Sequence, residues 1–168
     1  MPARSDDGSS PKQRHTTVER ASDRELVVKR WIDGPPHLVF EAWTRPELLQ
    51  RWWVPKSLGL VLLGCEVDAR VGGKYRLVFR FGDAESMAFF GTYLEVVPPS
   101  RLVWTNEEQG DAGQITTVTF DERDGGTLVT MRELFPTKEA LEAARASGAY
   151  DGLPETFDQL AALVAGRG

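Results

Sequence analysis

Most of the chain alternates apolar and polar side chains with a period of two, the pattern of β-strands that pack on one face. The segment KYRLVFRF (74–81) is the clearest case, because its tyrosine, leucine and phenylalanines fall on one face and its arginines on the other. Short connections rich in Gly, Pro and Asp separate these segments, so we expect neighbouring strands to be antiparallel. The predicted strands are 24–32, 59–70, 74–81, 86–97, 101–108, 114–122 and 126–134.

After the first strand the pattern changes to a helical period. Pro36 can start a short helix, since a helix leaves its first N–H groups without partners and proline has none to lose. Thr44 is expected to start a second short helix, with Glu47 completing a capping box and Pro55 ending the helix. We therefore predict two short helices between the first and second strands.

The C-terminal segment LPETFDQLAALVAG has one apolar stripe at the spacing of an α-helix. A shorter amphipathic segment, 137–147, precedes it. The last helix is the only long element available to cover the apolar face of the sheet. We predict an α+β fold in which a curved antiparallel sheet of about seven strands wraps around this helix, with a pocket where the sheet opens. The stripe consists of Phe157, Leu160, Ala161 and Val164.

Composition adds limits on domains and partners. Residues 1–23 are polar and are expected to form a tail, whereas 24–168 are expected to form a single domain. The formal net charge of −5 argues against nucleic acid as a partner. An apolar signal segment and a run long enough to span a membrane are both missing from the sequence, so we expect a cytoplasmic protein. The single cysteine, Cys65, cannot form an internal disulfide.

Candidate chemistry is sparse. His37 is the only histidine outside the polar tail, and neither a G-x-S-x-G motif nor a plausible nucleophile accompanies it, so no catalytic residue is predicted. No phosphate loop, dinucleotide fingerprint or metal-ligand spacing occurs, so we expect neither a cofactor nor a metal. Glu95 and Glu133 lie in or at the end of strands among apolar neighbours, where burial would make either one a candidate base. The favoured interpretation for both is a solvated strand face.

Two motifs stand out, and we interpret both as structural first. Trp52 and Trp53 are adjacent, and adjacent helical residues do not share a face. We expect one ring in the core and the other, Trp53, at the cavity or its mouth. The block D-x-R-x-G-G-x-Y begins at Asp68 and contains a glycine pair that suits a turn between strands.

These motifs also carry a resemblance. The segments RWIDGPPHLVFEAWTRPELLQRWWVP, EVDARVGGKYR, GTYLEVVPPSRLVWT, TVTFDERDGGTLVTM and SGAYDGLPETFDQLAALV occur in this order across about 24–165. Together they resemble the family related to the activator of the ninety-kilodalton heat-shock protein ATPase, within the START-like or SRPBCC superfamily, whose bacterial members are often described as polyketide-cyclase-like. The resemblance implies a helix-grip fold with a hydrophobic cavity between the sheet and the last helix. It does not imply one activity, because such a fold serves many functions.

We expect the protein to bind a small, largely apolar molecule in this cavity. Two alternatives remain open: a cyclase or aromatase acting on a poly-ketone, and a co-chaperone-like module that stimulates a chaperone ATPase. A monomer and a homodimer are equally compatible with the sequence. The cyclase alternative requires a polar cluster inside the pocket, for example Glu95 or Glu133 within reach of Tyr75 or Tyr93. The expected cavity residues, chosen for size and position, are Trp53, Phe79, Phe89, Trp104, Met131, Phe135, Phe157 and Leu160.

Overall fold

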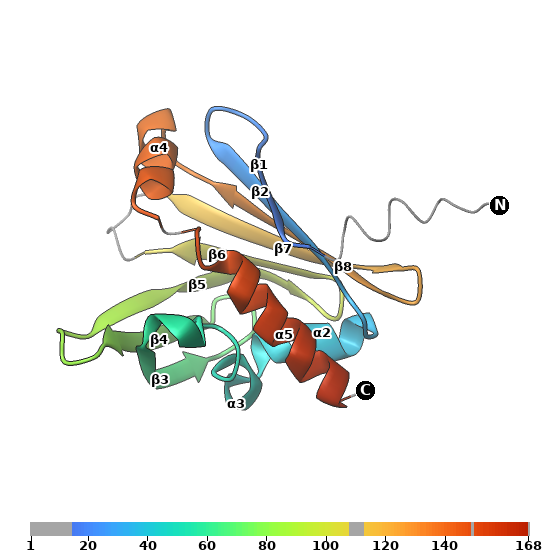
Figure 1. The fold of residues 1–168 in the computed structure, drawn as a ribbon. Coiled ribbons are helices and arrows are strands. Elements are labelled where there is room, and N and C mark those ends of the chain that lie inside the picture. Colours follow the sequence, from blue (N-terminus) through green and yellow to red (C-terminus); the bar gives the residue numbers. More distant parts are fainter. Residues whose placement is uncertain (1–14, 108–112, 149, 168) are drawn as a thin grey trace.

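The computed structural model describes residues 15–107, 113–148 and 150–167. Figure 1 shows one curved sheet with helices along its concave side. The sheet has eight antiparallel strands in the order β1-β2-β8-β7-β6-β5-β4-β3. The strands are β1 (Thr17–Arg20), β2 (Glu25–Ile32), β3 (Leu60–Val67), β4 (Lys74–Phe81), β5 (Met87–Val97), β6 (Arg101–Asn106), β7 (Gln114–Arg123) and β8 (Gly126–Leu134).

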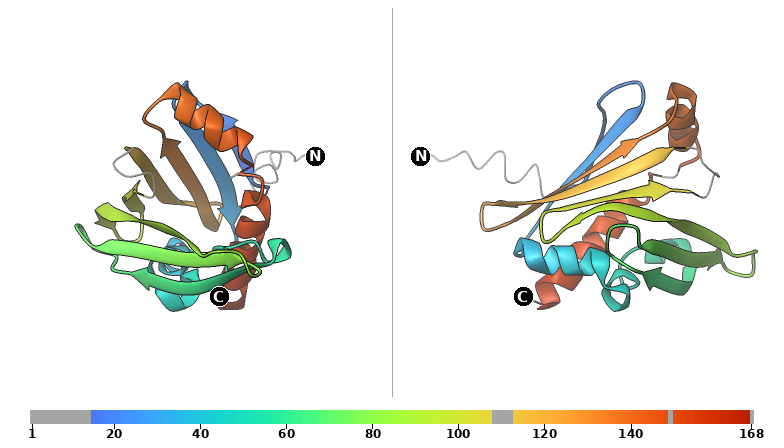
Figure 2. Two further views of the ribbon diagram at one scale, coloured as in Figure 1. Left: turned by 90° about the vertical axis from the view of Figure 1, so that its left-hand side faces the viewer. Right: turned by 180° about the vertical axis from the view of Figure 1, so that it is seen from behind.

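The helices begin near the positions that the helical patterns predict, but the second short helix ends at Leu49 and not at Pro55. Helix α5 (Leu153–Arg167) crosses the concave side next to α2 (Pro36–Thr44), as the views in Figure 2 show. The predicted α+β fold, a curved antiparallel sheet around a C-terminal helix, is therefore confirmed. The helical elements are α2 (Pro36–Thr44), α3 (Pro46–Leu49), the short 3-10 helix η2 (Lys56–Leu58), α4 (Lys138–Ala146) and α5 (Leu153–Arg167).

The sheet has one strand more than expected, because β1 falls inside the segment predicted as a polar tail. Val18 lies opposite Val28 of β2, and the two strands pair over four residues. Pairing with an existing sheet edge satisfies backbone groups without burying much apolar area, so composition alone misses such a strand. The expected tail boundary at residue 23 thus differs from the structure, and residues 1–14 lie outside the described part.

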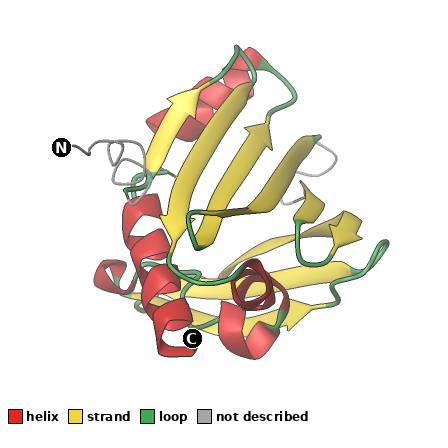
Figure 3. Cartoon of the chain, turned by 90° about the vertical axis from the view of Figure 1, so that its right-hand side faces the viewer, coloured by secondary structure: helices red, strands yellow, loops and turns green. Residues whose placement is uncertain are grey.

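The core is a cluster of aromatic and aliphatic side chains between the sheet, α2 and α5. Trp43 of α2 is its centre: its ring lies 5.9 Å from those of Trp104 and Phe120 and 6.1 Å from that of Phe157. Aromatic rings bury large apolar areas, so this cluster fixes how α2 and α5 sit on the sheet. Figure 3 shows the C-terminal helix lying against the strands. No helix in the described ranges has both the length and the apolar character to cross a membrane.

The junction between α2 and α3 differs from the predicted capping box. The Thr44 hydroxyl donates back to the carbonyl of Phe40, and Arg45 takes the N-cap position of α3 without a side-chain cap. Glu47 accepts from the Arg45 guanidinium, with Nε to Oε2 at 2.8 Å, and does not reach a backbone N–H of the cap. The competing i−4 hydrogen bond of a threonine near a helix end explains the difference.

The same junction decides the roles of the two adjacent tryptophans. Helix α3 ends at Leu49, so Trp52 and Trp53 follow in a turn and not in a helix. Trp52 is 1% exposed, and its Nε1 donates to the carbonyl oxygen of Ala42 at 2.9 Å. In a continuous helix, this carbonyl would accept a hydrogen bond from the backbone N–H of the residue four positions later. That residue is Pro46, which has no N–H. The indole of Trp52 therefore replaces a missing backbone donor.

The D-x-R-x-G-G-x-Y block forms the tight connection between β3 and β4. Gly72 has a φ of +84°, and a Cβ on Gly73 would lie 2.0 Å from the carbonyl oxygen of Asp68, so both positions require glycine. Arg70 pairs with Asp68 at 2.9 Å, and both side chains are exposed. The block is a structural turn, in agreement with the sequence analysis.

Candidate functional site

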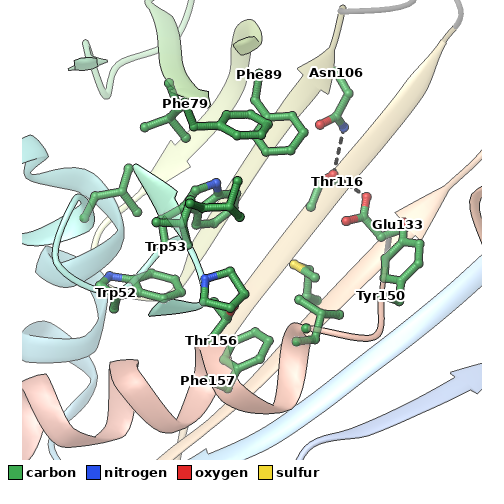
Figure 4. A pocket seen from close by; sticks show the side chains of 18 of the residues that line it. Trp52, Trp53, Phe79, Phe89, Asn106, Thr116, Glu133, Tyr150, Thr156 and Phe157 are labelled. Atoms are coloured by element: carbon green, nitrogen blue, oxygen red, sulfur yellow. Dashed lines mark hydrogen bonds between the residues drawn. The ribbon is translucent and has the colours of Figure 1, made fainter. Parts of the chain in front are cut away.

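A cavity of about 510 Å³ lies between the concave face of the sheet, the first half of α5 and residues 52–58, which we call the mouth loop. Figure 4 shows aromatic rings on one side of it and a line of polar side chains on the other. Its size is within the range of cavities that hold small organic molecules. The strands contribute side chains at every second position, as their alternation requires.

Seven of the eight residues expected to line a cavity do line this one, and Leu160 does not. Leu160 is fully buried in the core, whereas Phe157, on the same stripe of α5, reaches the cavity. Their roles in binding a ligand stay a prediction. The seven lining residues are Trp53, Phe79, Phe89, Trp104, Met131, Phe135 and Phe157.

Three apolar side chains mark the mouth of the cavity, because they line it and are also exposed to solvent. Leu58 is 50% exposed, Phe81 45% and Phe89 36%. The ring of Phe89 stacks on that of Phe79, which is buried, with centroids 4.9 Å apart. This pair forms a continuous aromatic surface from the mouth to the interior.

The polar side of the cavity is a chain of hydrogen bonds across three strands. Asn106 Nδ2 of β6 donates to Thr116 Oγ1 of β7 at 2.8 Å, and Thr116 donates to Glu133 Oε1 of β8. Gln114 Nε2 donates to the same oxygen of Glu133 at 3.1 Å. Tyr75 extends this network to β4. Its hydroxyl donates to a backbone carbonyl of β6 at 2.8 Å and lies 3.4 Å from Asn106 Oδ1. A buried carboxyl is thus held by two donors on the cavity wall.

Two tyrosines of the cavity wall stay protonated at neutral pH. Burial raises the pKa of Tyr150, and the charge of Glu133 nearby raises it further, while a hydrogen bond with Gln114 acts in the opposite direction. Burial also raises the pKa of Tyr93, together with the charges of Cys65 and Asp68. Both phenols therefore present a hydroxyl that can donate a hydrogen bond.

The expectation of a solvated strand face is wrong for Glu133 and right for Glu95. Glu133 is 8% exposed, whereas Glu95 is exposed and pairs with Arg101 at 2.9 Å. Strand alternation contained the signal for Glu133, because it lies between Met131 and Phe135 and shares their face.

The hydrogen-bond partners of Glu133 were not predicted from the sequence. Thr116 precedes Val118 and Phe120 at spacings of two, so it continues their buried face. Asn106 and Gln114 are cross-strand neighbours at the ends of β6 and β7. Nothing in the sequence indicates that Tyr150, from the turn before α5, folds back over this cluster.

The mouth loop is fastened to α5 by two polar side chains. Gln159 Nε2 donates to the carbonyls of Trp52 and Val54, each at 2.9 Å. Its Oε1 accepts a hydrogen bond from the backbone N–H of the residue two positions after Val54. Glu155, one turn earlier, accepts from both the backbone N–H and the hydroxyl of Ser57. These contacts hold the loop over the cavity.

The arrangement can recognise a ligand by hydrogen bonds and apolar contact, and its carboxyl can transfer a proton. His37 is exposed at the start of α2 and does not line the cavity. Within the described ranges, no group of three or more His, Cys, Asp or Glu side chains is arranged to hold a metal ion.

Solved structures with the same fold come from several bacteria. A protein of Rhodobacter sphaeroides has a TM-score of 0.82 at 23% identity, over 90% of this chain and 98% of that one. A protein of Chromobacterium violaceum is 33% identical, with a TM-score of 0.71, over 83% of this chain and 96% of its own. An AHSA1-like protein of Aeromonas hydrophila is 26% identical, with a TM-score of 0.65, over 83% and 94% of the two chains.

No curated protein matches this chain. The family model described as activator of Hsp90 ATPase homolog 1-like protein matches residues 33–165, a range that includes both short helices, the sheet from β3 to β8 and nearly all of α5. The fold of this family supports a ligand-binding or cyclase-like module. By this match over residues 33–165, the chain belongs to the family of activator of Hsp90 ATPase homolog 1-like proteins.

Proposed function

We propose that the protein binds a small, largely apolar molecule in the cavity, with its polar end at Glu133 and its apolar body against the aromatic wall. The observation that carries the proposal is the cavity itself: about 510 Å³ of space lined mainly by apolar side chains, with one cluster of polar groups. Apolar walls supply most of the affinity of such sites, and a few placed polar groups supply orientation.

A neutral dye of suitable size gives a direct test. Nile red has about 24 non-hydrogen atoms, and at about −0.3 kcal/mol per atom we expect a low-micromolar Kd. Its emission increases in an apolar site, so a saturable increase on titration with the full chain reports binding. No saturable signal up to the solubility limit of the dye contradicts the proposal.

A filled cavity provides the control. Ala144 of α4 lines the cavity, whereas Ala143 beside it is exposed and does not. Ala144→Phe should abolish dye binding by occupying the space, and Ala143→Phe should leave it unchanged. Equal binding by both variants, with circular dichroism spectra matching the natural protein, counts against the cavity as the site.

A second candidate, cyclase-like catalysis, is favoured by the buried carboxyl of Glu133. In this alternative the carboxylate takes a proton from a CH₂ group between two carbonyls, and the enolate attacks a second carbonyl carbon of the same chain. Tyr150 would donate a hydrogen bond to the oxygen that gains the charge. The test follows deuterium exchange at the central carbon of a 1,3-diketone by NMR. Enzyme-dependent exchange that Glu133→Gln removes supports catalysis, and exchange at the buffer rate excludes it for that substrate class.

The family name suggests a third candidate, stimulation of a chaperone ATPase. The exposed apolar side chains beside the turn that joins β4 to β5, including Phe81 and Met87, are the observation that favours a protein partner. The test measures ATP hydrolysis by purified chaperone from the same host, with and without the full chain. A faster rate in the presence of the chain supports this role. An unchanged rate and no binding at micromolar concentration exclude this role.

A further inference from the structure

The charges on the cavity wall are one-sided. Glu133 is the only residue with a formal charge among the described residues that line the cavity, and Lys, Arg and His do not occur in that set. The other polar side chains there are neutral: Asn106, Gln114, Ser147, Thr116, Thr156 and the tyrosines Tyr75, Tyr93 and Tyr150. A ligand with a carboxylate or phosphate would thus meet a carboxyl in a largely apolar site and no cation.

The remaining walls are aromatic, and they favour the same sign of ligand charge. Four of the five tryptophans line the cavity: Trp43, Trp52, Trp53 and Trp104. The faces of aromatic rings attract cations and repel anions, because the ring quadrupole places negative charge on the face. Carboxyl and rings together form a site of negative potential.

The carboxyl is also fixed in position. Thr116 and Gln114 both donate to Glu133 Oε1, so two neighbours on β7 orient the group before any ligand arrives. Preorganisation of this kind lowers the entropic cost of binding a donor group. An ionised carboxylate has several acceptor positions, so it can also accept a hydrogen bond from an N–H or O–H group of a ligand.

We infer that the cavity selects amphiphiles whose head group donates hydrogen bonds, amines foremost, and rejects those with an anionic head group. This inference rests on the proposed binding function and names its ligand class. The recognition combines a charge-assisted hydrogen bond to Glu133 with contact between the apolar body and the aromatic wall.

Three probes with one apolar body test the inference on the natural full chain. Decylamine, decanol and decanoate, each below its micellar concentration, are titrated against the tryptophan fluorescence. We expect decylamine to bind at least about tenfold more tightly than decanoate, with decanol between them. Decanoate binding as tightly as decylamine overturns the inference, while binding of decanol still supports the cavity as a site. No binding of any probe contradicts the proposed function itself.

A matched pair of variants assigns the selection to Glu133. Glu133→Gln keeps the shape of the side chain and should reduce the preference to within about threefold. Glu95→Gln changes the net charge by the same amount, but Glu95 is exposed and does not line the cavity. This variant should therefore keep the natural protein's preference for decylamine over decanoate. A preference that survives Glu133→Gln, or that Glu95→Gln reduces equally, overturns the inference, because it then reflects the overall negative charge. If Glu133→Gln does not fold, the probe series on the natural chain still decides.

Discussion

Trp52 and Trp53 are neighbours in the sequence, and replacing each by phenylalanine should have very different effects on stability. Trp52 is almost completely buried, and its ring packs 4.8 Å from that of Trp43. Trp53 is partly exposed and lies at the cavity. Trp52→Phe removes an indole N–H that bonds the carbonyl of Ala42, whereas Trp53→Phe removes no hydrogen bond on which the fold depends.

The cost of Trp52→Phe has two parts. The carbonyl of Ala42 becomes a buried acceptor without its donor, which costs about 1–3 kcal/mol. The smaller ring also leaves a small void, which adds about 1 kcal/mol. We expect a loss of about 2–4 kcal/mol in the free energy of unfolding for Trp52→Phe, and less than about 1 kcal/mol for Trp53→Phe.

Urea denaturation followed by far-UV circular dichroism measures both values without depending on the tryptophan signal. The midpoint should fall for Trp52→Phe at an unchanged slope, since the surface exposed on unfolding is the same. Equal midpoints for the two variants would refute the assignment of Trp52 to the helix junction. A larger loss for Trp53→Phe would refute it as well.

The remaining predictions concern a glycine, a carboxylate and the cysteine. Gly91→Ala should destabilise the fold by about 2 kcal/mol or more in thermal unfolding, because its Cβ would lie 1.9 Å from a carbonyl oxygen of the neighbouring strand. Gly64→Ala, where the nearest atom is 3.9 Å away, should change stability little. Hydrogen bonds from Ser57 hold the pKa of Glu155 below its ordinary value of 4.5, so this contact stabilises the mouth loop above that value and is lost as the pH falls through the lowered pKa. Hydrogen exchange of the Ser57 amide should therefore speed up relative to a distant strand amide in acid, and Glu155→Gln should remove this change; an unchanged profile in the variant would contradict it. Burial raises the pKa of Cys65 to about 11, so at pH 8 a disulfide reagent should react about a hundredfold more slowly with the folded protein than with the urea-unfolded chain. Equal rates would contradict the burial of this thiol.

Much of the cavity could be predicted because strand alternation is a local property. Phe79 shares a face with Tyr75 and Leu77 in any regular strand, and that face must be packed if arginines occupy the other. The polar cluster could not be predicted, since its members come from β6, β7, β8 and the turn before α5. Only strand register brings Asn106, Thr116 and Glu133 within hydrogen-bond distance.

By itself, the sequence determined the periods of its segments, and with them seven of the eight strands of the described residues, the approximate positions of the helices and the packed face of most of these elements. Tertiary structure alone decided which packed residues border empty space. Phe157 and Leu160 lie on one stripe of α5, yet one reaches the cavity and the other is buried against neighbours. It also decided that Glu133 borders the cavity, where it is the one residue with a formal charge among the described residues of the wall. The physical reason is that access to the cavity depends on the curvature of the sheet and on what lies opposite, and neither is encoded in the spacing along a single strand or helix.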